Sequence, residues 1–367
     1  MNLTVQHNRL QELLEVAKDV KTRSHDEVVP ASSVTWGVDP TNRLVARTDA
    51  ADWLPTSFAQ HQLCEKLGIP QKYADRMREE APKLWLDSLQ TWTDKQGDKE
   101  WFLRGIHTSD RRGTSEPLRL RAILTDRYRV IDNVDALSAV LNEMQHHGAD
   151  ANSFESGVVD EQQMHVKIRS KDLSVGVMDV NDLVVGGFML SNSEVGDAAI
   201  RLEPRIYRVA CRNGLIIEQA QVRQVHLGNA PADGSGDDLI YRNLRASVRD
   251  VLNSFGDIVE QLRNTTEMML DRVEINRAIK HVVREYALTE QQEANILIAF
   301  GQEPLQSKYG VIQAVTRAAQ EETNPLDAIE LERIGGRLVH DETWTNRMRE
   351  GIVRQSGKLV KMENWLN

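Results

Sequence analysis

The chain has 367 residues, of which 40% are apolar and 27% are charged, and its formal net charge is −10. This length allows two or three domains, and this composition excludes an intrinsically disordered protein. The acidic balance excludes a uniformly basic nucleic-acid-binding protein but is compatible with local basic patches.

The first 104 residues are expected to form a mixed α/β region. Apolar spacing and short extended runs predict a helix and two strands, at 7–20, 33–38 and 43–48. Two further helices are expected, one capped by Ser57 and closed by Gly68, the other opened by Pro70. Such a pair is typical of a helix-turn-helix, but the first turn of its second helix is only partly basic, which favours an ordinary helical hairpin.

Residues 105–227 are expected to form a β-sheet core rich in arginine. In the strand Leu118–Leu124, alternation puts Arg119 and Arg121 on one face. A helix is expected at 134–147, followed by strands at 164–169, 173–180, 183–190 and 198–202.

Asn213-Gly214 between two β-rich runs predicts a two-residue hairpin turn. In the arm before it, Tyr207, Val209 and Cys211 are expected to face the core, with Arg208 and Arg212 facing outward.

Arginine is concentrated in two segments of this acidic chain. From Arg104 to Arg129 there are seven arginines against three acidic residues, and from Arg201 to Arg223 there are five against two. The two segments therefore carry net charges of +4 and +3, and neither contains a lysine. Such local cationic character favours contacts with phosphate groups or with carboxylates of another part of the protein.

The remainder of the chain is expected to be a linker at 228–238 followed by a mainly helical region at 239–367. Helices are expected at 239–270, 274–286, 290–301, 308–322 and 343–352. The predicted fold class is therefore α+β, with a central antiparallel β-rich domain, flanking helices and a helical C-terminal region.

The sequence contains no recognisable catalytic motif, which favours a protein that is not an enzyme and has no cofactor or bound metal. A metal-dependent nuclease built on Asp110 or Glu161 is a lesser alternative, because such enzymes need several converging carboxylates. The two cysteines, Cys64 and Cys211, exclude a disulfide framework, and Cys211 is expected to be a small core residue. Without a secretory signal or a long apolar run, we expect a cytoplasmic protein with no membrane partner.

Several spaced motifs resemble the phage/plasmid-like protein family, domain of unknown function 932. They are Thr125–Asn133, Leu190–Ser193 with Gly196, Arg208–Leu215, Arg223 with His226, and Tyr309–Thr316. The resemblance implies a setting in mobile elements, where proteins of this size serve DNA replication, recombination or host takeover. It implies no particular activity.

The leading hypothesis is a nucleic-acid-binding protein of phage or plasmid type, acting as a single-strand annealing or recombination accessory factor. Arginine on an open sheet face binds phosphates and stacks on unpaired bases, so single-stranded DNA is the expected partner. The expected nucleic-acid-binding residues are Arg119, Arg121, Arg127, Tyr128, Arg129, Arg208, Arg212, Arg223 and His226. The alternative is a homo-oligomeric scaffold that binds a host protein, with the arginines paired to carboxylates of the C-terminal helices.

Overall fold

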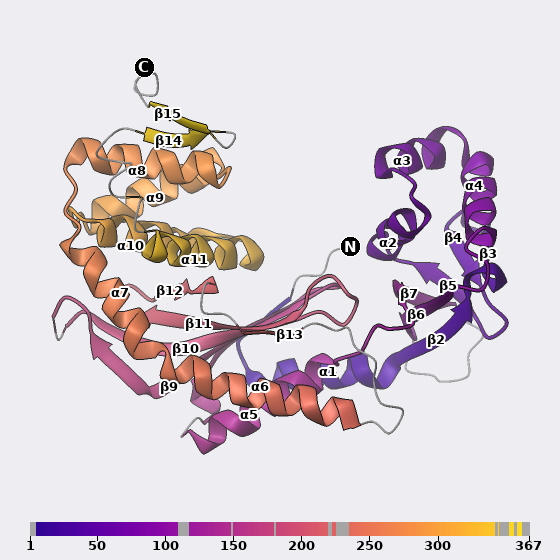
Figure 1. Cartoon of the computed structure of the whole chain (residues 1–367), viewed down its shortest axis with the longest axis horizontal. Coiled ribbons are helices and arrows are strands. Elements are labelled where there is room, and N and C mark those ends of the chain that lie inside the picture. Colours follow the sequence, from indigo (N-terminus) through magenta and orange to yellow (C-terminus); the bar gives the residue numbers. More distant parts are fainter. Residues whose placement is uncertain are drawn as a thin grey trace.

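The computed structural model describes residues 5–108, 117–147, 150–179, 181–218, 222–224, 235–341, 344, 352–355 and 358–361. Its architecture is α+β, as predicted, with two sheets and a helical C-terminal part. In Figure 1 an N-terminal lobe and a C-terminal helical bundle stand at opposite ends of a long central sheet. Within the described residues, no helix combines the length and apolar character needed to cross a bilayer.

The N-terminal lobe is built on a six-stranded sheet with the order β2-β6-β7-β5-β4-β3. Its strands are β2 (Ser24–Pro30), β3 (Thr35–Val38), β4 (Leu44–Arg47), β5 (Asp52–Pro55), β6 (Glu100–Ile106) and β7 (Leu118–Thr125). All pairs are antiparallel except β5 with β7. Three helices complete the lobe: α2 (Ser57–Leu67), α3 (Gln71–Glu80) and α4 (Pro82–Asp94). Four buried tryptophans anchor its core, Trp36, Trp53, Trp85 and Trp101.

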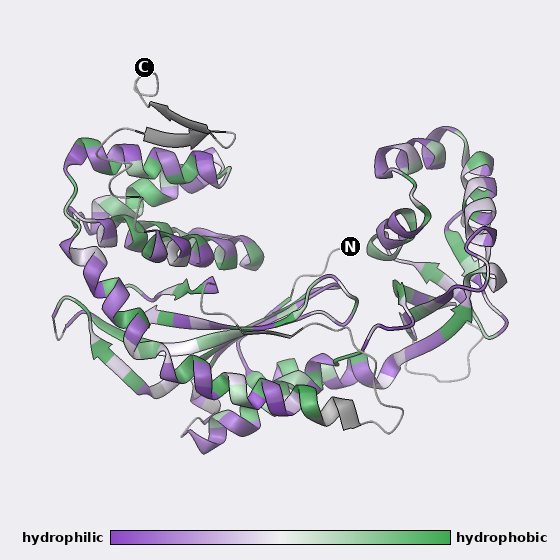
Figure 2. Ribbon diagram, in the orientation of Figure 1, coloured by the Kyte–Doolittle hydropathy of each residue, from purple (hydrophilic) through white to green (hydrophobic). Residues whose placement is uncertain are grey.

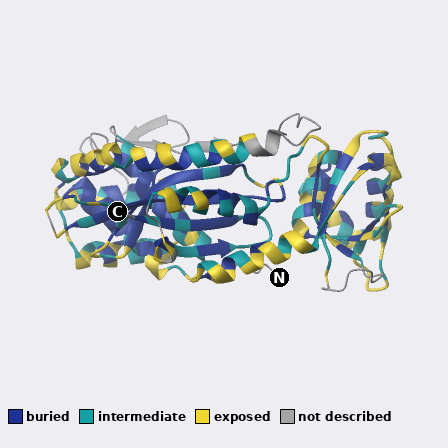
Figure 3. Ribbon diagram, turned by 90° about the horizontal axis from the view of Figure 1, so that it is seen from below, coloured by how far each residue is buried: buried dark blue, intermediate teal, exposed yellow. Residues whose placement is uncertain are grey.

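The central sheet has the order β1-β8-β9-β10-β11-β12, with β13 also paired to β11. Its strands are β1 (Val5–His7), β8 (Phe154–Val159), β9 (Met164–Gly176), β10 (Leu183–Asn192), β11 (Ile200–Arg208), β12 (Asn213–Ile216) and β13 (Val222–Gln224). Helices α1 (Leu10–Arg23), α5 (Asn133–His146) and α6 (Ser235–Asn253) share a core with it. In the view from below, these helices expose their outer sides and the strands behind them are buried (Figure 3).

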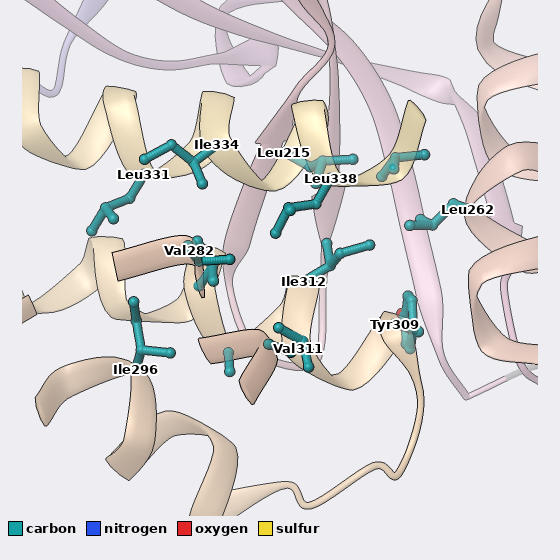
Figure 4. Packing of buried hydrophobic residues seen from close by; sticks show 14 of the residues in the cluster. Leu215, Leu262, Val282, Ile296, Tyr309, Val311, Ile312, Leu331, Ile334 and Leu338 are labelled. Carbon is teal, nitrogen blue, oxygen red and sulfur yellow. The ribbon is translucent and has the colours of Figure 1, made fainter. Parts of the chain in front are cut away.

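The C-terminal bundle packs on the edge of the central sheet that β12 forms. It consists of α7 (Phe255–Glu267), α8 (Arg272–Glu285), α9 (Glu290–Gln302), α10 (Lys308–Ala318) and α11 (Pro325–His340), followed by the hairpin β14 (Ile352–Gln355) and β15 (Lys358–Lys361). Leu215 of β12 shares one buried cluster with Ile312 of α10 and Leu338 of α11 (Figure 4). Apolar and polar residues alternate along these helices, as expected for amphipathic helices around one core (Figure 2).

The predicted Asn-Gly turn is wrong. Asn213 is already paired with Arg208, so the chain reverses over Val209–Arg212 instead. Arg212 has φ of 55° and provides the left-handed residue of this reversal. The predicted faces of the first arm are wrong for two residues: Arg208 is buried and Val209 is 43% exposed, whereas Arg212 is exposed as expected and Tyr207 and Cys211 are half-buried. The end of β11 thus differs from the predicted alternation, because the C-terminal bundle covers the face that was expected to be open.

Most of the other predicted elements have counterparts in the structure, but some differ in extent and several observed elements were not predicted. The two strands expected at 164–169 and 173–180 are one strand, β9, and the long helix expected at 239–270 is divided into α6 and α7. Helices α4 and α11 had no predicted counterpart, and neither did strands β1, β2, β5, β6, β8, β14 and β15. Of the helix expected at 343–352, nearly all residues lie outside the described ones.

Candidate anion-binding pocket at the amino end of α2

The arginines of the central sheet are engaged in buried ion pairs. Nη1 and Nη2 of Arg205 donate to the two carboxylate oxygens of Glu155 at 2.7 and 3.0 Å, and its Nε and Nη2 donate to Glu332 at 3.2 and 3.0 Å. Burial opposes ionisation of Glu332, but Arg205 and Lys167 outweigh it and lower the pKa of Glu332 to about 2. This cluster joins β8, β9 and β11 to α11.

Arg208 occupies a second buried cluster and does not face outward as expected. It donates to Asp182 and, through Nη1 and Nη2, to both carboxylate oxygens of Glu303 at 2.7 Å. Burial works against its charge, but the hydrogen bonds to Glu303 and Asp182 outweigh it and raise the pKa of Arg208. Tyr309 donates its hydroxyl to Asp182 at 2.9 Å, and the half-buried Cys211 donates its thiol to Glu303 at 3.1 Å. The guanidinium of Arg208 therefore serves a contact between sheet and bundle.

Two arginines of the first arginine-rich segment connect the N-terminal lobe to the central sheet. Arg104, 1% exposed, donates to Asp26 at 2.8 Å and to Asp132 at 2.6 Å. Arg121 donates to Glu194 at 2.9 Å, and the other oxygen of Glu194 accepts the backbone N–H of Asn133 at 2.8 Å. Asp26 belongs to β2 of the lobe itself, whereas the contacts with Asp132 and Glu194 join β6 and β7 to the segments that enter α5 and leave β10.

Beside this contact the N-terminal lobe contains a pocket of about 610 Å³ with a positive lining. Arg43, Arg78 and Arg119 line it from three separate parts of the lobe, and Glu161 is the one lining carboxylate among the residues that the structure describes. Apolar side chains form the rest of the wall: Val38, Leu44, Leu54, Pro55, Pro82, Trp85 and Leu86. The pocket thus combines cationic groups with an apolar wall, as ligand pockets of this size do.

Each lining arginine is held by a carboxylate. Arg43 donates its Nε to Asp39 at 2.8 Å, and the backbone N–H of Arg43 holds the pKa of Asp39 at about 2. Arg78 pairs with Asp75 and donates Nη1 to Gln60 at 3.0 Å. Arg119 pairs with Glu161, and its side chain is 47% exposed. These pairs orient the guanidinium groups and leave other donors of each group for a ligand.

Helix α2 begins at the pocket. Thr56 is its N-cap and accepts the backbone N–H of Ala59 at 3.1 Å, while Thr56 and the exposed Ser57 line the pocket. The first N–H groups of a helix lack intrahelical partners, and the helix dipole places partial positive charge there. Figure 1 shows α2 on the side of the lobe that is turned toward the C-terminal bundle. Because Thr56 and Ser57 line the pocket, the amino end of α2 faces it.

Two buried donors in the pocket lining have no acceptor among the residues that the structure describes. One is Nε1 of Trp85, whose residue is 3% exposed, and the other is Nε of Arg78. Unsatisfied buried donors are rare in folded proteins, because each costs about 1–3 kcal/mol. Both atoms are covered by other protein atoms, so they lie behind the pocket wall rather than on its open surface.

A smaller pocket of about 270 Å³ adjoins the first. Thr56, Arg119 and Glu161 line both pockets, so the Arg119–Glu161 ion pair stands where they meet. Arg121 and His7 line the smaller one, together with Asp160, and Nε2 of His7 is buried without a partner among the described residues. Because Glu161 and His7 belong to the central sheet and its turns, this region is formed by both parts of the molecule.

The other predicted site residues lie elsewhere. Arg127 is exposed just beyond β7, and Arg129 is half-buried there. Tyr128 between them donates its hydroxyl to the backbone carbonyl of Ser193 at 3.0 Å. Arg212 is exposed at the edge of the bundle, where it lines a separate pocket of about 240 Å³. Arg223 lies in β13 with its side chain outside the described set, and His226 lies outside the described residues altogether.

No group of three described histidine, cysteine or carboxylate side chains is arranged to hold a metal ion. Of the nuclease candidates, Asp110 lies outside the described residues and Glu161 is paired with Arg119. Of the predicted nucleic-acid-binding residues, Arg119 lines both pockets and Arg121 lines the smaller one, whereas the pocket residues Arg43, Arg78, Thr56 and Trp85 were not predicted. The run Pro55-Thr56-Ser57 marks the amino end of α2 in the sequence, and this was the one feature that pointed to this part of the pocket.

The family described as Domain of unknown function (DUF932) matches residues 122–349. The chain belongs to this family. The matched range contains most of the central sheet and the helices α5–α11, whereas the pocket residues Arg43, Arg78 and Arg119 precede it. No curated protein and no solved structure matches the chain.

Proposed function

We propose that the protein binds single-stranded nucleic acid at the N-terminal lobe, with the pocket at the amino end of α2 as the central contact. The observation that carries this proposal is the convergence of Arg43, Arg78 and Arg119 on one pocket in a chain of net charge −10. Guanidinium groups bind phosphate oxygens, and a helix amino terminus adds N–H donors for the same anion. Arg121, Arg127 and Arg129 continue the cationic character along β7 and the turn after it.

The size and lining of the pocket favour an unpaired strand over a duplex. A volume of about 610 Å³ accommodates roughly one nucleotide with its phosphate, whereas a duplex is too wide to enter a cavity of this class. The apolar wall formed by Leu44, Pro82 and Leu86 offers a surface for a base, which is accessible only when it is not stacked in a duplex. Single-stranded binding proteins combine such surfaces with cationic grooves.

The buried clusters of Arg205 and Arg208 support a different role for the second arginine-rich segment. Their carboxylate partners Glu332 and Glu303 belong to the C-terminal bundle or its loops, so these arginines stabilise the junction of sheet and bundle. We therefore leave the second arginine-rich segment out of the proposed nucleic-acid contact. A phage or plasmid setting and an accessory role in strand annealing or recombination are the finer form of the proposal, supported by the sequence resemblance.

Fluorescence anisotropy with a labelled oligonucleotide tests the proposal, using single and double strands at low and moderate salt. We expect preferential binding of the single strand, weakened by salt as phosphate contacts require. The double variant Arg78→Gln/Arg119→Gln should lower affinity at least about tenfold, since each charged hydrogen bond contributes roughly 1.5–3 kcal/mol.

Arg76→Gln is the matched control, because Arg76 lies on the same helix as Arg78 but its side chain is 70% exposed and pairs only locally with Glu80. Equal loss of affinity in Arg76→Gln and the double variant would contradict a specific pocket. Absence of binding to either kind of strand at low salt would overturn the proposed function. Acceleration of the pairing of complementary strands by the wild-type protein would support the annealing role.

A further inference from the structure

We infer that the pocket at the amino end of α2 recognises a phosphate monoester of a nucleotide, either a free nucleoside monophosphate or the phosphorylated end of a strand. This inference rests on the proposed function and narrows it to a chemical group. It depends on the number and the position of the cationic and backbone donors that line the pocket.

The donors exceed what an internal phosphodiester accepts. A phosphodiester has one negative charge and two unbridged oxygens, whereas a monoester carries roughly −1.5 to −2 charges at neutral pH and three strong acceptor oxygens. The pocket presents guanidinium groups of Arg43, Arg78 and Arg119, together with the first N–H groups of α2 at Ser57. A group with three free oxygens matches donors that approach from several directions.

Two donors without acceptors in the described part of the chain lie behind the pocket wall. Trp85 is 3% exposed, lines the pocket and has an indole Nε1–H without an acceptor among the described residues. The Nε–H of Arg78, whose guanidinium carbon lies 5.7 Å from the centre of the Trp85 ring, is unsatisfied as well. Both atoms are covered by protein, so an occupant reaches them only when the Trp85 or Arg78 side chain moves.

Two features limit how a strand enters. The Arg119–Glu161 pair stands between this pocket and the smaller one beside it, and the apolar side chains of Leu44, Pro82 and Leu86 line the remaining wall. A terminal nucleotide places one phosphate against the donors and one base against that wall. A continuous strand has to leave the pocket on a second side, past the Glu161 carboxylate, which repels phosphate.

Ser57 provides a variant that removes anion binding without weakening the fold. Its side chain is exposed in the first turn of α2, where a carboxylate interacts favourably with the helix dipole. Ser57→Asp should therefore fold at least as well as the wild type while placing a negative charge where the phosphate binds. Ser57→Asn is the matched control, because it has nearly the same shape and no charge.

The test compares one oligonucleotide sequence with a 5′-phosphate, a 3′-phosphate or hydroxyl groups at both ends, in anisotropy titrations with the full chain. We expect one phosphorylated end to tighten binding about tenfold, which equals roughly 1.4 kcal/mol. This gain should vanish in Ser57→Asp and persist in Ser57→Asn and Arg76→Gln. It should also grow between pH 5 and pH 7, as the phosphate loses its second proton near pH 6.

The outcomes separate this inference from the proposed function. If all three oligonucleotides bind equally, the strand-binding function stands and recognition of a phosphorylated end is wrong. If no oligonucleotide binds but a nucleoside monophosphate binds saturably and is lost in Ser57→Asp, the free nucleotide is the ligand and the proposed function fails. If inorganic phosphate, nucleoside monophosphate and phosphorylated strands all fail to bind in calorimetry, the monoester site itself is refuted.

Discussion

Arg208 and Glu303 form a two-point ion pair in which Nη1 and Nη2 of the guanidinium each donate to one carboxylate oxygen at 2.7 Å. Arg208 is the last residue of β11, and Glu303 follows the end of α9. The pair therefore joins the central sheet to the bundle at one point, next to Asp182 and Tyr309. A residue that looked like a surface phosphate contact is instead part of the molecule's internal structure.

Arg208→Ala should destabilise the protein by about 3–5 kcal/mol, because it leaves the buried Asp182 carboxylate without its charged partner. Urea unfolding followed by circular dichroism measures the change. Arg212→Ala, four residues further along the chain at an exposed position, should change stability by no more than about 0.5 kcal/mol. A mild effect of Arg208→Ala, similar to that of Arg212→Ala, would contradict the structural role of the pair.

His165 should make stability depend on pH in a defined window. Burial, with the nearby charges of Arg333 and Arg201, lowers the pKa of His165 from 6.5 to about 3, and its Nδ1 lies 2.8 Å from the hydroxyl oxygen of Ser191. The folded state keeps this ring neutral, whereas the unfolded chain takes up the proton below about pH 6.5. Stability should therefore be complete above pH 6.5 and fall as the pH drops from 6.5 toward 3, by up to about 1.4 kcal/mol per pH unit.

Comparison of the wild type with His165→Gln checks this dependence, with the free energy of unfolding measured at several values between pH 7.5 and pH 5. The variant should be less stable than the wild type at pH 7.5, and the difference should shrink as the pH falls. Carboxylates such as Glu332, with its pKa lowered to about 2, lose their contribution mainly below pH 4.5 and so act outside this range. Parallel curves for the two proteins from pH 7.5 to pH 5 would rule out the assignment to His165.

Gly336 lies where α11 crosses β12 at close range. A Cβ at this position would be 1.8 Å from the backbone carbonyl oxygen of Ile216, and backbone cannot move aside as a flexible side chain does. Gly336→Ala should cost about 3 kcal/mol, at the upper end of overpacking effects. In Gly301→Ala, another helical glycine whose Cβ would meet nothing within 4 Å, the higher helix propensity of alanine should instead add about 0.5–1 kcal/mol. Thermal unfolding of the two variants should shift in opposite directions.

Thr56 should contribute both to the stability of α2 and to the proposed anion pocket. Its hydroxyl oxygen accepts the N–H of Ala59 at 3.1 Å, so Thr56→Ala should lower stability by about 1 kcal/mol. Thr56→Ser keeps the capping oxygen and should restore most of that loss. Nucleotide affinity, measured by calorimetry, should follow the same order among the three proteins; a loss of affinity in Thr56→Ser equal to that in Thr56→Ala would argue against a role of the cap.

The sequence predicted local features well where one residue type determines the backbone. Gly68 ends α2 in the left-handed conformation, with φ of 66°, as a helix-closing glycine should. The N-cap is Thr56 rather than the predicted Ser57, because both residues can cap and only the side-chain hydrogen bond to Ala59 decides between them. The alternation of Arg119 and Arg121 in β7 was also correct.

The sequence could not predict which arginines are covered. Residues of β11 are buried on both faces, so alternation gave no information about the side on which the C-terminal bundle packs. The pocket was hidden for a related reason. Arg43, Arg78 and Arg119 lie far apart in the chain, and only the closure of the six-stranded sheet and its three helices brings them to the same cavity.

The order of the strands along the chain has a consequence for synthesis on the ribosome. β1 pairs with β8, roughly 150 residues later in the sequence, whereas all strands of the smaller sheet lie between residues 24 and 125. The N-terminal lobe thus interrupts the central sheet as an inserted unit. While the chain is being made, this lobe has every strand it needs before β8 has emerged, so β1 and α1 must wait, without their partners, until the lobe they precede is complete.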